Sequence, residues 1–178
     1  MCEGYEEDLD MYEKAEGFPR RQLDNETLLR PISTLSYLKT PPLVGPDTQV
    51  GEALNAMIQK GTGAVLVVEH GKVAGIFSGR DALMKCLCHE KYSERPVRQF
   101  MTPDPDCLTP EDSIAFALNR MVVGGYRHIP LVNPAHEPVG ILVMRDVVGY
   151  VVSFFPAEVL NAPPHSAHNL PDRHRDGG

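Results

Sequence analysis

The apolar residues of the chain recur at helical spacing in two stretches about 65 residues apart. Each set occupies positions i, i+3, i+4, i+7 and i+8, which share one face of an α-helix. The two sets are Val50, Ala53, Leu54, Met57 and Ile58, and then Ile114, Ala117, Leu118, Met121 and Val122. Candidate N-cap residues precede them (Asp47-Thr48 and Asp112-Ser113), and glycines follow them (Gly61, Gly63, Gly124 and Gly125). We therefore predict two amphipathic helices that pack on a core.

The segments around these helices repeat as well, so the chain contains an internal duplication. Apolar runs that follow the helices predict buried strands at 64–68 and 129–132, and runs after the next turn predict strands at 73–77 and 139–143. Short helices are predicted over 80–87 and 145–152, short first strands near 43–44 and 107–108, and matching lead-ins at 32–35 and 97–100. Each copy therefore has the order β-α-β-β-α, which is an α/β fold.

The copies span residues 31–90 and 96–155. One copy of ~60 residues buries little apolar surface alone, so we expect the two copies to pack together as one unit. Residues 1–30 form an acidic N-terminal segment that we expect to be mobile or loosely docked, and residues 162–178 read as a disordered tail.

The negative charge lies almost entirely at the start of the chain. The net charge is −7, and residues 1–26, with nine acidic and three basic side chains, account for −6 of it. The nearly neutral remainder offers no electrostatic footprint for nucleic acid or for an anionic membrane, so we expect neither partner. The first residues lack the blocks of a signal peptide, and the apolar stretch at 147–155 is too short to span a bilayer. We expect a cytoplasmic protein whose four cysteines stay reduced.

Catalytic and metal-binding motifs are not found in the sequence. The spacing of Cys86-x-Cys88-His89 is wrong for a zinc knuckle, and no second ligand pair stands at a suitable distance. There is no Gly-x-Ser-x-Gly elbow, Walker loop or His-Glu-x-x-His, and Asp104 and Asp106 lie in a proline-rich turn that looks structural. We predict no metal, no cofactor and no enzymatic activity.

In their order and spacing, the two copies resemble the CBS domain family. The second copy carries Phe100-Met-Thr-Pro103, then Tyr126-Arg-His-Ile-Pro-Leu-Val132, then Gly140-Ile-Leu-Val-Met-Arg-Asp146. The first copy matches through Gly75-Ile-Phe-Ser-Gly-Arg-Asp81. The resemblance covers most of residues 31–155 and leaves both tails unexplained.

The resemblance implies two CBS repeats packed about a pseudo-two-fold axis, with two clefts between them. Such clefts commonly bind AMP, ADP or ATP; some members bind S-adenosylmethionine or cyclic di-AMP, and some bind nothing known. Such modules often pair, so the resemblance implies a homodimer. Because no effector domain accompanies the repeats, we expect the signal to reach an unidentified effector protein.

The candidate ligand-binding residues of the first copy are Ser78, Arg80 and Asp81. A helix that begins there presents free N–H groups to a phosphate, and Gly75 and Gly79 allow a ligand close to the backbone. The Asp81 carboxylate can accept hydrogen bonds from both ribose hydroxyls, and the resemblance assigns ribose to Asp81 and phosphate or ribose to Ser78. Alternatively, Ser78 and Asp81 only cap the helix, and Arg80 is an exposed helix residue.

The second copy departs from this pattern. It keeps Asp146 and Arg145, but Val143 replaces the hydroxyl residue. Arg127 and His128 offer cations to a phosphate instead; alternatively, they are a solvated loop charge and a half-buried side chain.

The resemblance also places adenine near a lead-in and the first strand after it, which points to Met101 among others. Two functions remain open: a sensor of an adenosine-containing ligand, or a structural and dimerisation module with vestigial clefts. Val143 and the uncharged Gly63-Ala64 modestly favour the second.

Overall fold

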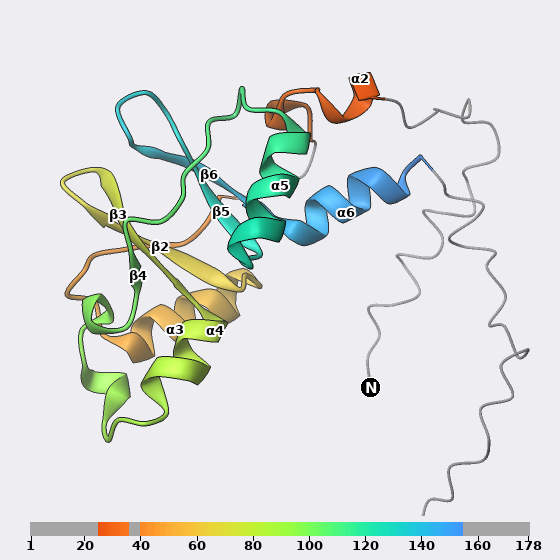
Figure 1. Cartoon of the computed structure of the whole chain (residues 1–178). Coiled ribbons are helices and arrows are strands. Elements are labelled where there is room, and N and C mark those ends of the chain that lie inside the picture. The colour runs from red at the N-terminus through yellow and green to blue at the C-terminus, as the bar shows by residue number, and fades with distance from the viewer. Residues whose placement is uncertain (1–24, 36–39, 155–178) are drawn as a thin grey trace, which may run out of the picture. The chain divides into compact units, whose positions relative to one another are not determined.

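The computed structural model describes residues 25–35 and 40–154 (Figure 1). The predictions for the acidic segment before residue 25 and for the tail from residue 162 therefore lie outside the described residues. The described residues up to Tyr150 belong to one compact unit. The α-helices and strands of the described residues are α2 (Asn25–Leu28), β1 (Leu43–Val44), α3 (Val50–Lys60), β2 (Ala64–Glu69), β3 (Lys72–Ser78), α4 (Gly79–Asp81), β4 (Thr102–Pro103), α5 (Ile114–Gly124), β5 (His128–Val132), β6 (Pro138–Val143) and α6 (Met144–Val152).

The strands form two sheets, and the first of them takes β4 from the second copy. The first sheet has the order β1-β2-β3-β4, with β1 parallel to β2 and the other pairs antiparallel. The second contains β5 and β6, and the strand predicted near 107–108 is reduced to a parallel bridge between Leu108 and Leu131 within the described part of the chain. The other predicted strands are confirmed, and so is the α/β class.

The lead-in of each copy packs against the other copy. The Ile32 N–H donates to the Asp112 carbonyl oxygen at 2.9 Å, and the Val97 N–H donates to the Thr48 carbonyl oxygen at 2.8 Å. Ile32 is buried with the core under α5, whereas Val97 and Phe100 are buried with the core under α3. Neither core is complete without a segment from the opposite copy.

The predicted helical faces are only partly correct. Val50, Ala53 and Met57 are buried, but Ile58 is 77% exposed, and Val122 at the equivalent position is 74% exposed. Position i+8 is rotated about 80° from position i in an α-helix, so it lies at the edge of the buried face. These two side chains belong to the surface rather than to the core.

The helix ends follow the sequence signals with one exception. Ser113 caps α5 by accepting a hydrogen bond from the Phe116 N–H at 3.2 Å. In the first copy the N-cap is Gln49, whose side chain makes no capping hydrogen bond, and the Thr48 hydroxyl accepts a hydrogen bond from the Gly45 N–H. Both helices end at a glycine in the left-handed region, Gly61 at φ 58° and Gly125 at φ 67°.

The helix predicted over 80–87 has a different form. The α-helical part is the short α4, and a π-helix continues it over Ala82–Cys86. The helix predicted over 145–152 is confirmed as α6. None of the helices in the described ranges is long and apolar enough to cross a membrane.

Candidate functional site

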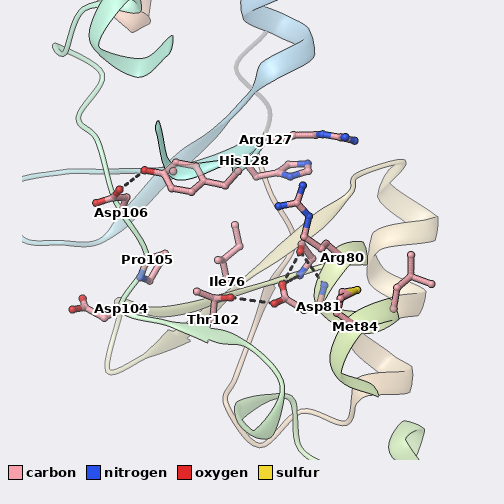
Figure 2. A pocket seen from close by; sticks show the side chains of 14 residues that line it. Ile76, Arg80, Asp81, Met84, Thr102, Asp104, Pro105, Asp106, Arg127 and His128 are labelled. Carbon is pink, nitrogen blue, oxygen red and sulfur yellow. Dashed lines mark hydrogen bonds between the residues drawn. The ribbon is translucent and has the colours of Figure 1, made fainter. Parts of the chain in front are cut away.

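A cavity of about 740 Å³, here called the large cleft, opens where the end of β3 faces the start of β5 (Figure 2). Elements of both copies line it, including β4 and the loop that follows it. Five of the predicted binding residues line this cleft: Ser78, Arg80, Asp81, Arg127 and His128. The fold thus brings together side chains that the sequence analysis selected in separate copies.

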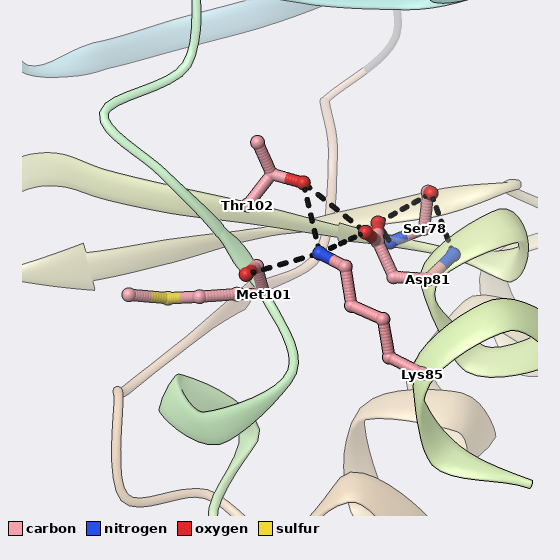
Figure 3. Close-up of polar contacts among 5 residues, drawn as sticks. All are labelled: Ser78, Asp81, Lys85, Met101 and Thr102. Carbon is pink, nitrogen blue, oxygen red and sulfur yellow. Dashed lines mark hydrogen bonds and ion pairs between the residues drawn. The ribbon is translucent and has the colours of Figure 1, made fainter. Parts of the chain in front are cut away.

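The Asp81 carboxylate is enclosed by protein donors (Figure 3). Its Oδ2 accepts from the Ser78 backbone N–H at 2.9 Å and from the Ser78 hydroxyl at 2.6 Å, within a complete capping box. Its Oδ1 accepts from the Thr102 hydroxyl at 3.1 Å and pairs with the Lys85 ammonium at 2.6 Å. Ser78 and Asp81 therefore do cap the start of α4.

Lys85 links the first copy to the segment that follows the second lead-in. Its Nζ lies 3.3 Å from the Met101 carbonyl oxygen and 3.3 Å from the Thr102 hydroxyl (Figure 3). Burial raises the pKa of Asp81, but the hydrogen bonds from Lys85 and Ser78 outweigh burial and hold that pKa below its usual value. The carboxylate is therefore ionised at neutral pH.

The cations of the large cleft come from both copies. Arg80 donates from Nη1 to the Gly125 carbonyl oxygen at 2.7 Å and so connects α4 to the end of α5. Arg127 is exposed, and His128 is half-buried at the start of β5. Burial, together with the Arg127 charge, lowers the pKa of His128, while Asp146 acts in the opposite direction. Two arginines and a neutral imidazole thus face the cleft at neutral pH.

Tyr126 and Asp106 form a part of the cleft that the sequence analysis did not identify. The Tyr126 hydroxyl and the Arg120 guanidinium both donate to Asp106 Oδ2, and the tyrosine ring lies against Gly124. The hydrogen bond from Tyr126 and that from Arg120 lower the pKa of Asp106. Thr102 and Lys85 were also missed; only the spacing of Lys85, four residues after Asp81, offered a signal.

The equivalent site of the second copy is a much smaller cavity, here called the small pocket, of about 30 Å³. Arg145 and Val143 line it at the positions that correspond to Arg80 and Ser78. His128 lines both cavities. Asp146 is buried, and its Oδ2 has no hydrogen-bond partner among the described residues. Val143, at the position of Ser78, has no hydroxyl to donate.

Met101 occupies a different place from the other candidates. It does not line the large cleft in the part of the chain that the structure describes, and its side chain lies over Gly75 instead. A Cβ at position 75 would clash with the Met101 sulfur, so this glycine makes room for the methionine. Of the two thiols near the end of the first copy, Cys86 is buried and Cys88 is exposed.

The family model of the CBS domain matches residues 35–87 and 97–153. The chain belongs to the CBS domain family. The two copies are therefore CBS domains, and the large cleft lies between them.

Three known proteins illustrate the similarity. The chain is 34% identical over 113 residues to the meiotically up-regulated gene 70 protein of Schizosaccharomyces pombe, covering 62% of this chain and 15% of that protein. The CBS domain protein PAE2072 from Pyrobaculum aerophilum, complexed with AMP, is 18% identical with a TM-score of 0.62, covering 70% of this chain and 98% of that one. The CBS domain pair of protein MJ0100, in complex with 5′-methylthioadenosine and S-adenosyl-L-methionine, is 19% identical with a TM-score of 0.62, and the coverage is again 70% and 98%.

The CBS pair makes up only part of the curated relatives. The chain spans 15%, 40% and 63% of the length of the first three that it matches. The second of these is the arabinose 5-phosphate isomerase KdsD of Francisella tularensis. CBS pairs therefore occur both in enzymes and in short proteins.

Proposed function

We propose that this CBS pair is a regulatory module that binds an adenosine-containing ligand, AMP, ADP or ATP, in the large cleft and passes the signal to an effector protein. One observation carries the proposal: Ser78, Arg80, Asp81, Arg127 and His128 line a single cavity of about 740 Å³. The complexes of PAE2072 with AMP and of MJ0100 with adenosine derivatives support the ligand class. The role we propose is regulatory rather than catalytic.

Each wall of the large cleft suits one part of a nucleotide. Arg80 and Arg127 present guanidinium groups, which bind phosphate through paired hydrogen bonds. Asp81 and Thr102 present oxygens that can bond ribose hydroxyls. Ile76, Leu83 and Met84 supply apolar surface of the kind that a flat base requires.

The experiment that tests the proposal is isothermal titration calorimetry with AMP, ADP and ATP. Arg80→Gln removes a cation from the large cleft, while Arg145→Gln makes the same change at the equivalent position of the small pocket. A charge-assisted hydrogen bond to phosphate accounts for about 10- to 100-fold in affinity, so Arg80→Gln should weaken binding by that factor. Arg145→Gln should change the affinity by less than about twofold, because Arg145 does not line the large cleft.

A second candidate function has an observation of its own. The Asp81 acceptor positions are filled by Ser78, Thr102 and Lys85, as expected for a carboxylate with a structural role. If the wild-type protein binds none of the three nucleotides at millimolar concentration, the adenine-nucleotide function fails. The chain is then a structural or dimerisation module, or a sensor of S-adenosylmethionine or cyclic di-AMP.

The proposal includes a homodimer. Apolar side chains on α3 and α5 are exposed to solvent, among them Ile58 at 77%, Val122 at 74% and Val123 at 74%. Exposed apolar surface of this kind is typical of interaction sites. Light scattering should give the mass of a dimer for the wild-type protein and of a monomer for Val122→Glu. A monomeric wild type at micromolar concentration would contradict this part of the proposal.

A further inference from the structure

The acceptor positions of the Asp81 carboxylate are already occupied. A carboxylate has about four lone-pair positions for hydrogen bonds. Two on Oδ2 receive the Ser78 N–H at 2.9 Å and the Ser78 hydroxyl at 2.6 Å. Two on Oδ1 receive the Thr102 hydroxyl at 3.1 Å and the Lys85 ammonium at 2.6 Å. A vicinal diol can therefore bind Asp81 only by displacing one of these donors.

The donors differ in how readily they can leave. The Ser78 contacts form a capping box within one turn, so their loss would open the start of α4. Thr102 belongs to β4, which is paired with β3. Lys85 holds the carboxylate from the end of a long side chain that is 42% exposed, and water can solvate its ammonium after it leaves. Lys85 is the donor most easily exchanged.

We propose that Lys85 is an internal competitor for the ligand's vicinal diol, and that ligand entry exchanges the Lys85 ammonium for one ribose hydroxyl at the Oδ1 position that the ammonium leaves. This inference rests on the proposed function, because it requires the diol to bind at Asp81. Figure 3 shows the ammonium between the carboxylate and the segment of Met101 and Thr102.

The exchange has a consequence for signalling. Lys85 belongs to the π-helix of the first copy, whereas Met101 and Thr102 follow the second lead-in, so the ammonium links the two. When ligand displaces the Lys85 ammonium from Asp81, the connection between the π-helix and the Met101–Thr102 segment is released. Without ligand, this connection is kept. The equivalent position in the second copy is Tyr150, which offers no ammonium, so the competitor acts at the large cleft alone.

The first test compares adenosine with 2′,3′-dideoxyadenosine, two probes without phosphate that differ only in the diol. In Lys85→Met the competitor is absent, so adenosine should bind about five- to tenfold more tightly, whereas dideoxyadenosine should change by less than about twofold. Lys60→Met, at an exposed position in the last turn of α3, is the matched control and should alter neither affinity. Equal weakening of both probes, or an unchanged affinity for adenosine, would overturn the inference.

The second test uses the unaltered protein. An amine-reactive label followed by mass spectrometry measures the reaction rate of Lys85 with and without saturating adenosine, with Lys60 as the internal reference. The rate at Lys85 should rise severalfold on binding, and an unchanged or lower rate would overturn the inference while leaving nucleotide binding intact. Absence of binding by every nucleotide and nucleoside would instead overturn the proposed function, and the inference with it.

Discussion

The imidazole of His128 lies against the α-carbon of Gly63, at the boundary between the large cleft and the small pocket. A Cβ at position 63 would stand 3.0 Å from both Cε1 and Nε2 of the ring, closer than side chains normally approach. The same ring lines both cavities. A side chain of the second copy therefore occupies space that the glycine of the first copy leaves free, between two cavities of unequal volume.

This inequality predicts one nucleotide per chain. The small pocket, at about 30 Å³, has room for little more than a water molecule, whereas the large cleft measures about 740 Å³. Calorimetry with AMP should give a stoichiometry of one. Gly63→Ala should push the imidazole toward the large cleft and weaken AMP binding, while Gly149→Ala in α6, where an added Cβ meets nothing within 4 Å, should not. Two equivalent sites per chain would contradict this interpretation.

His128 also predicts a pH dependence of stability. Burial and Arg127 lower the pKa of His128 below its ordinary 6.5, so between its folded pKa and 6.5 the unfolded chain binds the proton and the folded chain does not. Stability is therefore greatest above about pH 6.5 and declines as the pH falls through the folded pKa. Chemical denaturation between pH 5.5 and 7.5 should show this slope in the wild type, and His128→Gln should reduce it.

The control for that measurement is His136→Asn, which removes a histidine from the turn between β5 and β6. It should retain the wild-type slope. Because a phosphate beside His128 favours the protonated ring, AMP should in addition bind more tightly as the pH falls, and adenosine should not. Parallel pH profiles for the two ligands would show that the phosphate does not lie at His128.

The helices and strands of the two copies could be predicted from the sequence because the spacing of apolar residues within each element indicates its type. The β-α-β-β-α order, Ser113 as a cap and the glycine ends of α3 and α5 all depend on neighbours within one turn. The exchange of lead-ins had no such signal. Val97 and Phe100 belong in sequence to the second copy, and only tertiary packing places them in the core of the first.

The exchanged lead-ins predict that the two copies unfold together. Phe100 is 3% exposed in the core under α3, so Phe100→Ala should cost about 3–5 kcal/mol through the cavity that it leaves. Because each core holds residues of both copies, calorimetric unfolding should remain a single transition at a lower temperature. Phe116→Ala, at a 47% exposed position of α5, is the control and should have a smaller effect. Two separate transitions in either protein would contradict the exchange as a source of cooperativity.

The residues of the candidate site also fall into two groups: those that are close in sequence and those that only the fold brings together. Ser78, Arg80 and Asp81 lie within one turn, and a motif identifies them together. Thr102 reaches Asp81 from 21 residues away, and Tyr126 reaches Asp106 across 20 residues. No periodic pattern connects residues at such distances, so contacts of this kind become visible only when the sheets and loops are placed.

The Asp146 carboxylate of the second copy carries an oxygen without a hydrogen-bond partner among the described residues. Oδ2 of Asp146 is buried, and no described residue donates to it, whereas the equivalent oxygen of Asp81 accepts from Ser78. A buried polar atom left without a partner costs about 1–3 kcal/mol. Val143→Thr places a hydroxyl at the position equivalent to Ser78 with almost no change in volume. It should raise the free energy of unfolding by about 1 kcal/mol, because the new hydroxyl can donate to Asp146.

Val139→Thr makes the same chemical change on the same strand at a 51% exposed position, and it should stay within about 0.5 kcal/mol of the wild type. The free energy of unfolding is measured with denaturant at one pH for four proteins: the wild type, Val139→Thr, Val143→Thr, and Val143→Thr combined with Asp146→Asn. If Val143→Thr is less stable than Val139→Thr, the hydroxyl has not reached the carboxylate, and the equivalence of positions 78 and 143 fails at the level of side-chain geometry. If Val143→Thr is more stable and Asp146→Asn abolishes the gain, the lost hydroxyl is the reason for the unpaired oxygen.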